Sequence, residues 1–247
     1  MVSVTEKTKN VKQHFDSIAS HYSEELPKYF QDYLLIRKMD FIQKYLKDLD
    51  KMVGLDIGCG QGKYLNFLNL HTRNMVGIDF SFNNVKNTLT KNKLNNHALN
   101  SDGGKLPFKS NYFNFCLCIN VLHHLPSQEL QETCLNEMIR VTKESGIIFI
   151  FDLSLKNPIF RLYLKYLFPR IRAIDEGDEL FFSEKKIIKL VKKQTKLIGL
   201  EFYSFVPDII PRSILRMFML FESLIEKTFL KRLAMHKVII LKKNEEK

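Results

Sequence analysis

The stretch VGLDIGCGQGKYLNFL, residues 53–68, decides the fold. It opens with a short apolar run typical of a buried strand and closes with the apolar spacing of a helix. Between the two, glycine occupies three alternate positions, Gly58, Gly60 and Gly62. Glycine has no Cβ, so it suits a sharp backbone turn and the close approach of a ligand to the main chain. The stretch therefore predicts a strand, a ligand-binding turn and a helix in succession.

Strand and helix patterns alternate through the rest of the chain. Strands that are apolar throughout and separated by helices form parallel sheets that are covered on both faces. The chain shows no internal repeat or low-complexity linker, so we expect one α/β domain. Helices are expected at 11–22 and 30–47, and strands at 52–58, 75–80, 97–102, 113–120, 146–152, 197–206 and 236–243.

The composition is that of an ordinary globular protein, with 247 residues of which 45% are hydrophobic and 26% charged. The four cysteines have no CxxC spacing, so they are interpreted as buried thiols of a reducing compartment: Cys59, Cys116, Cys118 and Cys134. The amino-terminal residues are polar, and no uncharged apolar stretch approaches the roughly 20 residues that span a bilayer. We therefore expect a cytoplasmic protein.

Polar side chains stand near the carboxyl ends of the first four predicted strands, where open α/β sheets bind ligands. Asp79, at the end of the second strand, is suited to accept hydrogen bonds from the two hydroxyls of a ribose. Asp102 is suited to accept from an adenine amino group, with Gly103 letting the chain pass close to the ring. Asp56 favours a positively charged group, and Asn120 ends the fourth strand. The set predicts a site for a nucleoside that carries a cationic amino acid rather than for a dinucleotide.

These residues stand in motifs that resemble the class I S-adenosylmethionine-dependent methyltransferases, in the group similar to the ubiquinone and menaquinone C-methyltransferases. The resemblance spans about residues 11–152 and implies S-adenosylmethionine as the cofactor. It also implies a Rossmann-like, seven-stranded, mostly parallel sheet with helices on both faces and a carboxyl-terminal antiparallel hairpin. The matching motifs are HFDSIASHYSEEL (14–26), LDIGCGQGKYL (55–65), GIDFS (77–81), SDGGKLPFKSNYFNFCLCINVLHHL (101–125) and EMIRVTKESGIIFIFD (137–152).

The resemblance assigns a part of the cofactor to each matching position. Residues 11–50 become helices that cover the cofactor, over a cofactor-binding core at 51–152, and Tyr22 becomes a lid residue near the sulfonium. The remaining contacts are Gly58, Cys59, Gly60 and Gly62 under the methionine part, Asp56 by its amino group, Asp79, Phe80 and Ser81 at the ribose, Asp102 and Gly103 at the adenine, and Asn120 near the reacting methyl group.

Methyl transfer needs a base only when the acceptor must lose a proton. The candidates are two neighbouring histidines just beyond the fourth strand. His124 is kept as the base candidate, whereas His123 is expected to pack and to bond a nearby carbonyl, with the other ring in solvent. Tyr22 is the second candidate for a catalytic role. The sequence offers no cluster with metal-ligand spacing, so no metal is expected.

The acceptor must be recognised by segments that the methyltransferase core does not explain. Two extra stretches, 153–182 and 207–235, are predicted to be helical caps, aromatic-rich and basic. Residues 156–247 carry 20 Lys and Arg against 11 Asp and Glu, whereas residues 1–155 carry 18 against 16. Apolar stripes flanked by Arg and Lys suit a lipid tail or an anionic membrane surface, and equally a simple lid over a pocket.

Three functions remain open on the sequence alone. The first is methyl transfer to a small, bulky apolar or lipid-linked acceptor, with peripheral contact at the inner face of an anionic membrane. The second is methylation of a tRNA wobble uridine, which the glycine motif and the two histidines also resemble and which the basic last third would suit. The third is a regulatory protein that binds S-adenosylmethionine without catalysis.

Overall fold

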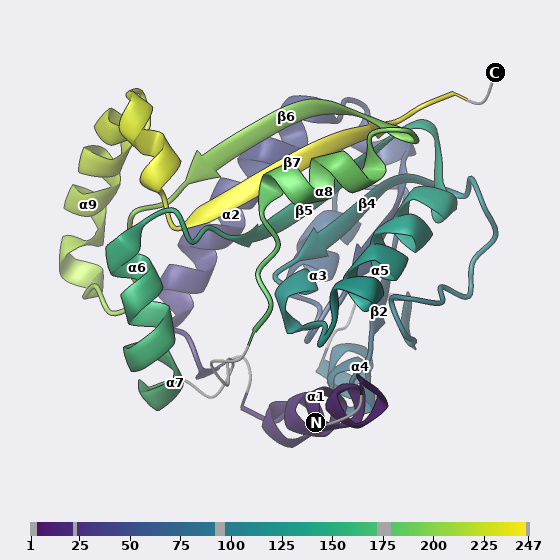
Figure 1. Ribbon diagram of the computed structural model, residues 1–247, viewed down its shortest axis with the longest axis horizontal. Coiled ribbons are helices and arrows are strands. Elements are labelled where there is room, and N and C mark those ends of the chain that lie inside the picture. Colours follow the sequence, from purple (N-terminus) through teal and green to yellow (C-terminus); the bar gives the residue numbers. More distant parts are fainter. Residues whose placement is uncertain (1–3, 22–23, 92–96, 172–178, 246–247) are drawn as a thin grey trace.

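The computed structural model describes residues 4–21, 24–91, 97–171 and 179–245. A seven-stranded sheet in the order β3-β2-β1-β4-β5-β7-β6 forms the centre of the molecule (Figure 1). The first five strands pair in parallel, and β7 runs antiparallel to both β5 and β6. The predicted seven-stranded sheet with its antiparallel hairpin is therefore confirmed. The strands are β1 Val53–Ile57, β2 Asn74–Asp79, β3 His97–Asn100, β4 Phe113–Ile119, β5 Thr142–Leu153, β6 Thr195–Tyr203 and β7 His236–Lys243.

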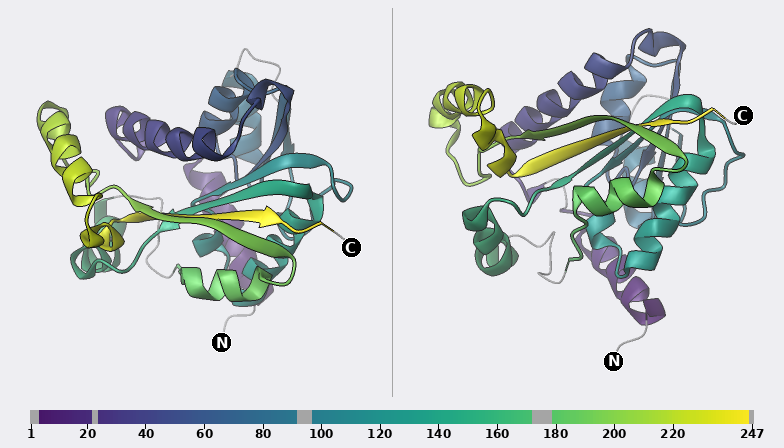
Figure 2. Two further views of the ribbon diagram at one scale, coloured as in Figure 1. Left: turned by 90° about the horizontal axis from the view of Figure 1, so that it is seen from above. Right: turned by 45° about the horizontal axis from the view of Figure 1, so that its top comes forward.

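Helices cover both faces of the sheet (Figure 2). Buried side chains of α5 and α8 pack on one face, and those of α2, α3 and α4 pack on the other. The α-helices are α1 Val4–Ile18, α2 Lys28–Tyr45, α3 Lys63–Asn69, α4 Phe82–Lys91, α5 Gln128–Val141, α6 Pro158–Leu162, α7 Phe168–Ile171, α8 Glu184–Val191 and α9 Arg212–Ile225. Shorter helical turns are η2 Leu49–Lys51, η3 Leu122–His124, η4 Tyr163–Leu167 and η5 Phe229–Leu233.

The central strands are buried from both sides, as their unbroken apolar sequences require. In β4, Phe115, Cys116, Leu117 and Cys118 are each fully buried, with alternate side chains entering the two core clusters. All four cysteines of the chain are buried and free, so the interpretation as buried thiols is confirmed.

The predicted caps contain helices at 158–171, 212–225 and 229–233, at the end of the molecule beyond the carboxyl end of β6 (Figures 1 and 2), while residues 172–178 of the first cap lie outside the described residues. The first is a continuous helical segment in which η4 is a π-helical turn between α6 and α7. At its start, the Asn157 side chain accepts hydrogen bonds from the amides of Ile159 and Phe160. Pro158 occupies the first helical position, where a backbone N–H would have no partner within the helix. The second comprises α9 and η5, inserted between β6 and β7. Within the described residues, no helix is both long and apolar enough to cross a bilayer.

Candidate functional site

The three glycines of the β1–α3 loop adopt a backbone that other residues avoid. Gly58, Gly60 and Gly62 have φ of +69°, +53° and +77°. A Cβ on Gly58 would also lie 2.2 Å from a methyl carbon of Val121, so the loop has no space for a side chain there. The sequence prediction of a tight turn is met, because the positive φ values are those that glycine adopts at little cost.

Asp79, at the end of β2, fixes this loop. Its Oδ2 accepts a hydrogen bond of 2.8 Å from the amide of Gly60, and its Oδ1 accepts one of 2.9 Å from the amide of Ser81. The carboxyl group is buried, and burial raises its pKa while the two amides oppose that rise. The Asn84 side chain donates a third, longer bond of 3.4 Å to Oδ1. A carboxylate has about four acceptor positions, so these bonds leave about one for a hydroxyl donor of a ligand.

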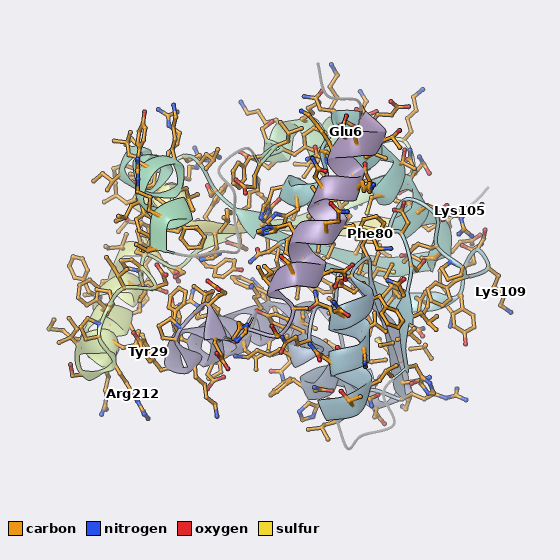
Figure 3. All side chains as sticks on the ribbon, turned by 90° about the horizontal axis from the view of Figure 1, so that it is seen from below. Glu6, Tyr29, Phe80, Lys105, Lys109 and Arg212 are labelled. Carbon is orange, nitrogen blue, oxygen red and sulfur yellow. The ribbon has the colours of Figure 1, made fainter. Side chains whose placement is uncertain are left out.

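A cavity lies beside the loop, at the carboxyl ends of β1, β2 and β4. We call it the glycine-loop cavity. Its lining includes Gly58, Gly60, Asp79, Phe80, Asp102, Gly103 and Asn120. Ser81 and His124 line it as well, so the structure brings together nine of the residues that the sequence marked. Three residues of α1 also line it, Thr8, Val11 and Phe15, and Figure 3 shows Phe80 beside this helix.

Two groups of hydrogen bonds hold α1 over the glycine-loop cavity. The Asp16 carboxylate accepts a bond of 2.6 Å from the Ser81 hydroxyl at the start of α4. Just beyond α1, the Ala19 carbonyl accepts from the side chains of Gln61 and Asn87, at 2.6 and 3.0 Å. Ser81 therefore anchors the covering helix, a role that the sequence did not suggest. Tyr22, the predicted lid residue, lies outside the described residues.

Asp102 and Gly103 reach the glycine-loop cavity from the loop after β3. The Asp102 side chain is exposed, and its Oδ1 accepts a hydrogen bond of 2.8 Å from the amide of Gly104. One oxygen of the carboxylate thus closes a turn. A Cβ on Gly103 would lie 3.2 Å from Cys134 Sγ, so a side chain here would crowd the wall of the cavity.

A second cavity, the lysine cavity, adjoins the first one on the α2 side. Asp56 and Lys38 both line it and are both buried. Burial raises the pKa of Asp56 to about 7, with repulsion from Asp79 adding to the rise and Lys38 opposing it. Burial likewise lowers the pKa of Lys38 to about 7. The Asp56 Oδ2 atom is buried without a hydrogen-bond partner, which marks it as an acceptor for a ligand.

Lys38 is a site residue that the sequence analysis missed. It stands four residues from both Leu34 and Ile42, two buried positions of α2. The sequence does contain a signal for it, because a lysine on the apolar face of a helix is uncommon. Its ammonium donates a hydrogen bond of 2.8 Å to the Tyr64 hydroxyl. Cys59 also lines the lysine cavity. Its Sγ atom would lie 2.8 Å from a Cβ placed on Gly77, so the thiol occupies the space that a side chain at position 77 would need.

A third cavity, the apolar cavity, lies between α2, the first cap and the start of β7. Its polar lining residues are Asn120, His123, His124, Asp208 and His236. The rest of the lining is aliphatic or aromatic, including Phe30, Leu34, Leu153, Phe160, Leu164 and Phe168. Burial lowers the pKa of His236 to about 3, so this ring is neutral near pH 7.

Asn120 lines all three cavities. Its φ is +54°, a left-handed conformation that asparagine tolerates better than most residues. Its Oδ1 is buried without a hydrogen-bond partner. The end of β4 is therefore the point at which a ligand in the first two cavities would meet one in the third.

The two histidines differ from the roles expected of them. His123 is buried, and its Nδ1 lies 2.5 Å from Oδ1 of Asp152, so its partner is a carboxylate and not a carbonyl. Burial alone would raise the pKa of Asp152, but the neighbouring His123 brings it below its usual value. His124 is half-buried against Phe15, with ring centroids 4.9 Å apart, so the expectation of one solvated ring is wrong. Burial holds the pKa of His124 well below its usual value, which makes it a weak base.

The donor set fits S-adenosylmethionine. Asp79 keeps about one acceptor position for a ligand hydroxyl, and Asp56 and Asn120 each hold a buried acceptor oxygen without a partner. Lys38 adds a cation that would face the ligand's carboxylate, beside the acid that would face its ammonium. Among the residues that the structure describes, no group of three or more His, Cys, Asp or Glu is arranged to hold a metal ion.

The comparisons with known proteins agree with this fold. Residues 55–150 match the family model described as a methyltransferase domain. The chain is 34% identical over 145 residues to the uncharacterized protein MJ1252 of Methanocaldococcus jannaschii, covering 58% of this chain and 51% of that one. It is 32% identical over 150 residues to tRNA (carboxymethyluridine(34)-5-O)-methyltransferase of Schizosaccharomyces pombe, covering 60% and 59%. The chain thus spans between half and three fifths of the length of these two relatives.

The fold is also that of a solved methyltransferase. The structure of an S-adenosylmethionine-dependent methyltransferase of Thermotoga maritima, described as a possible histamine N-methyltransferase, superposes with a TM-score of 0.65. The identity is 15%, and the match covers 95% of this chain and all of the other. Residues 55–150 thus match a methyltransferase-domain family model, and the chain as a whole has the fold of the class I S-adenosylmethionine-dependent methyltransferases.

Proposed function

We propose that the protein transfers a methyl group from S-adenosylmethionine to a bulky apolar or lipid-linked acceptor held in the apolar cavity. The observation that carries this proposal is the meeting of the three cavities at Asn120. When bound, the cofactor supplies a methyl group already activated on a sulfonium. The protein's contribution is to position the acceptor and to exclude water.

The cofactor would extend through the glycine-loop and lysine cavities. Asp79 would hold the ribose hydroxyls and Asp102 the adenine amino group, as the sequence predicts. Asp56 and Lys38 would hold the amino and carboxylate groups of the methionine part, because they present opposite charges in one buried cavity. Asn120 would lie nearest to the reacting group.

The lining of the apolar cavity favours an apolar acceptor. Much of its wall is apolar, and binding there is favourable when apolar surface of the acceptor is removed from water. This wall includes Phe30, Leu153, Phe160 and Leu164. Among the described lining residues there is no lysine or arginine to pair with an acidic acceptor, and Asp208 would repel one. A sugar or a carboxylate is therefore a poorer fit than an aromatic ring or an isoprenoid chain.

His123 is the base that we propose for an acceptor with a proton to lose, in place of His124. Asp152 holds the Nδ1 side of the ring at 2.5 Å, which orients the imidazole in the wall of the apolar cavity. An acidic O–H or an enolisable C–H presented in the cavity would give its proton to the imidazole as the methyl bond forms. Asp152 would stabilise the resulting imidazolium.

The test uses methyl-labelled S-adenosylmethionine with a cell extract, separated afterwards into lipid, RNA and aqueous fractions. We expect label in the lipid fraction, and none with Asp79→Ala. His123→Gln is expected to slow transfer about 100-fold or more while cofactor affinity is unchanged. His97→Gln, at an exposed position on β3, is the matched control and should transfer at the wild-type rate. Label in the aqueous fraction alone would contradict the apolar acceptor, and label in no fraction would leave only cofactor binding without catalysis.

A tRNA acceptor is the second candidate, because the relative from Schizosaccharomyces pombe is named for a tRNA carboxymethyluridine. Under that function, label would enter the RNA fraction and ribonuclease would release it. The absence of a cation among the described residues of the apolar cavity weighs against a carboxymethyl acceptor.

A further inference from the structure

The first cap is apolar on both sides. Phe160, Leu164 and Phe168 face inward and are buried in a core cluster with Leu153. On the outer side, large apolar residues are open to solvent: Ile159 at 77% exposed, Leu162 at 56%, Tyr166 at 51% and Leu167 at 44%. A surface helix in water ordinarily shows a polar outer face. This outer face therefore lacks a partner among the described residues.

The second cap repeats the pattern. Leu215 and Phe218 pack inward on a cluster with Phe30 and Leu34. The outward side chains are mostly apolar: Met217, Leu220, Phe221 and Leu224 are each more than 60% exposed, and Phe229 is 82% exposed. Clusters of exposed apolar residues of this kind mark interaction sites rather than ordinary surface.

The two caps form one surface, which we call the cap surface, comprising residues 158–171 and 212–233. The Asn157 side chain donates a hydrogen bond of 3.1 Å to the carbonyl of Leu233, and the Tyr163 hydroxyl donates one of 2.5 Å to Asp208 Oδ1. The first bond brings the start of α6 against η5. Figures 1 and 2 show the two caps at the same end of the molecule.

The charges of the cap surface are one-sided. Its cations are Arg161, Lys165, Arg170, Arg212, Arg216, Lys227, Lys231 and Arg232. Its two acids turn inward: Glu222 lies 2.7 Å and Glu226 2.6 Å from the guanidinium of Arg37 on α2. Lys231 pairs with Glu201 of β6. The solvent-facing side thus combines large apolar groups with positive charge, and its own carboxylates are engaged elsewhere.

We infer that the cap surface docks on an anionic lipid bilayer. Apolar side chains would enter the headgroup boundary while arginine and lysine remain at the level of the lipid phosphates. An RNA partner would pair with the cations but would leave groups such as Phe229 and Leu220 in water. A membrane surface satisfies both kinds of side chain, so charge and apolarity agree on one occupant.

The location of the apolar cavity deepens this inference, and this step rests on the proposed function. Phe160 and Leu164 line the cavity from the same helical segment whose opposite side is part of the cap surface. Val206, Pro207 and Asp208, just before α9, line it from the second cap. A lipid-linked acceptor would therefore reach the cavity between the two caps without leaving the bilayer surface.

Vesicle co-sedimentation tests the docking directly. The full chain should sediment with vesicles of phosphatidylglycerol and phosphatidylcholine and not with phosphatidylcholine alone, and binding should weaken as salt rises. Arg212→Gln with Arg216→Gln should lower partition about 30-fold at low salt, since two cations are removed. The matched control is Lys105→Gln with Lys109→Gln, which removes the same charge from two exposed lysines at the opposite side of the molecule (Figure 3).

A second variant tests the apolar component. Leu220→Ser with Leu224→Ser leaves every charge in place and changes two side chains that are 66% and 63% exposed, so folding should be unaffected. It should weaken vesicle binding at least tenfold. Wild-type binding by this variant, or equal loss in the lysine control, would show non-specific charge attraction and overturn the inference.

The other occupants give different results. If the cap surface joins two copies of the chain, sedimentation velocity without lipid will show a dimer that Leu220→Ser with Leu224→Ser breaks. If it binds RNA, tRNA will bind with a steep salt slope and vesicles will not. Either outcome overturns membrane docking. Calorimetry with S-adenosylhomocysteine is run on the same samples, so failure of the proposed cofactor site is seen separately from failure of vesicle binding.

Discussion

The cofactor-binding half, β1 to β4, and the two caps use their apolar residues in opposite ways. In the first, Leu55, Phe115 and Leu117 are fully buried between helices. In the caps, Ile159 and Phe229 are mostly exposed although the helices that carry them are packed on the sheet's end. The apolar residues of the first region are covered by other parts of the chain, whereas many of those in the caps are open to solvent among the described residues. On the proposed function, recognition of the cofactor and recognition of the acceptor would therefore depend on apolar residues that are used differently within one domain.

The largest effect that would test this contrast is expected at the glycine loop. Gly58→Ala must place a Cβ against Val121 at a φ of +69°, and both the strain and the overlap destabilise the fold. We expect a loss of about 3 kcal/mol in the free energy of unfolding, measured by urea denaturation. Gly104→Ala is the control, since its nearest neighbour would lie at an ordinary 3.4 Å. Equal stability of the two variants would contradict the account of the loop.

Removal of the Asp79 carboxylate comes next. Asp79→Ala deletes the acceptor for the ribose and for the Gly60 amide, so S-adenosylhomocysteine should bind about 1.5–3 kcal/mol more weakly by calorimetry. Asp102→Ala, which removes an exposed carboxylate already engaged in a turn, should cost about 1 kcal/mol or less. Reversal of this order would place the ribose elsewhere in the site.

The attachment of the second cap to the first region is tested at Arg37. Arg37→Met removes the guanidinium from the buried Glu222 carboxylate, which then keeps the Tyr33 hydroxyl and the Phe205 amide as described donors. We therefore expect α9 to lose about 2 kcal/mol of local stability. Hydrogen exchange should accelerate at residues 212–225 and remain unchanged in β1 and β4. Lys51→Met, which removes an exposed ion pair to Asp48 at 3.9 Å, should change neither region. Uniform acceleration would mean that the cap and the core unfold together.

The smallest effect is a pH dependence of cofactor affinity. A ligand ammonium favours ionised Asp56, so affinity should fall as pH decreases below about 7, where this carboxyl takes up a proton. A ligand carboxylate favours protonated Lys38, so affinity should also fall above about pH 7. Each limb is at most tenfold per pH unit, or about 1.4 kcal/mol.

Calorimetry with S-adenosylhomocysteine between pH 5.5 and 8.5 (roughly one and a half units on either side of these pKa values) checks both limbs. Asp56→Asn should flatten the acidic limb alone, and Lys38→Met the alkaline limb alone. A wild-type affinity that does not change with pH would remove this pair from the binding site.

Much of the cofactor-binding half was predictable because local chemistry determines it. The turn at Gly58, the acid at Asp79 and the polar end of β4 each follow from backbone geometry or from the position of a strand terminus. Lys38 and Asp152 were missed because each acts through a partner far away in the sequence. Lys38 reaches Asp56 only after α2 packs on the sheet, and Asp152 meets His123 only once β5 pairs with β4.

The caps were predicted as helices, but their packing was not. Apolar spacing in residues 158–171 is the same whether a side chain faces the cavity or the solvent, since both sides of the helix are apolar. Likewise, Ser81 was expected at the ribose because of the motif around it, and it lines the glycine-loop cavity, but the bond from its hydroxyl to Asp16 of α1 was not foreseen. Side-chain direction depends on tertiary contacts that a pattern of residue types does not contain.

The left-handed backbone of Asn120 has a consequence for anyone who redesigns this scaffold. Glycine would adopt a φ of +54° with less strain, so a search for thermostability alone would select glycine at this position. That choice would delete the one buried amide oxygen shared by all three cavities. If Asn120 has the ligand role proposed for it, stability and function favour different residues at this position.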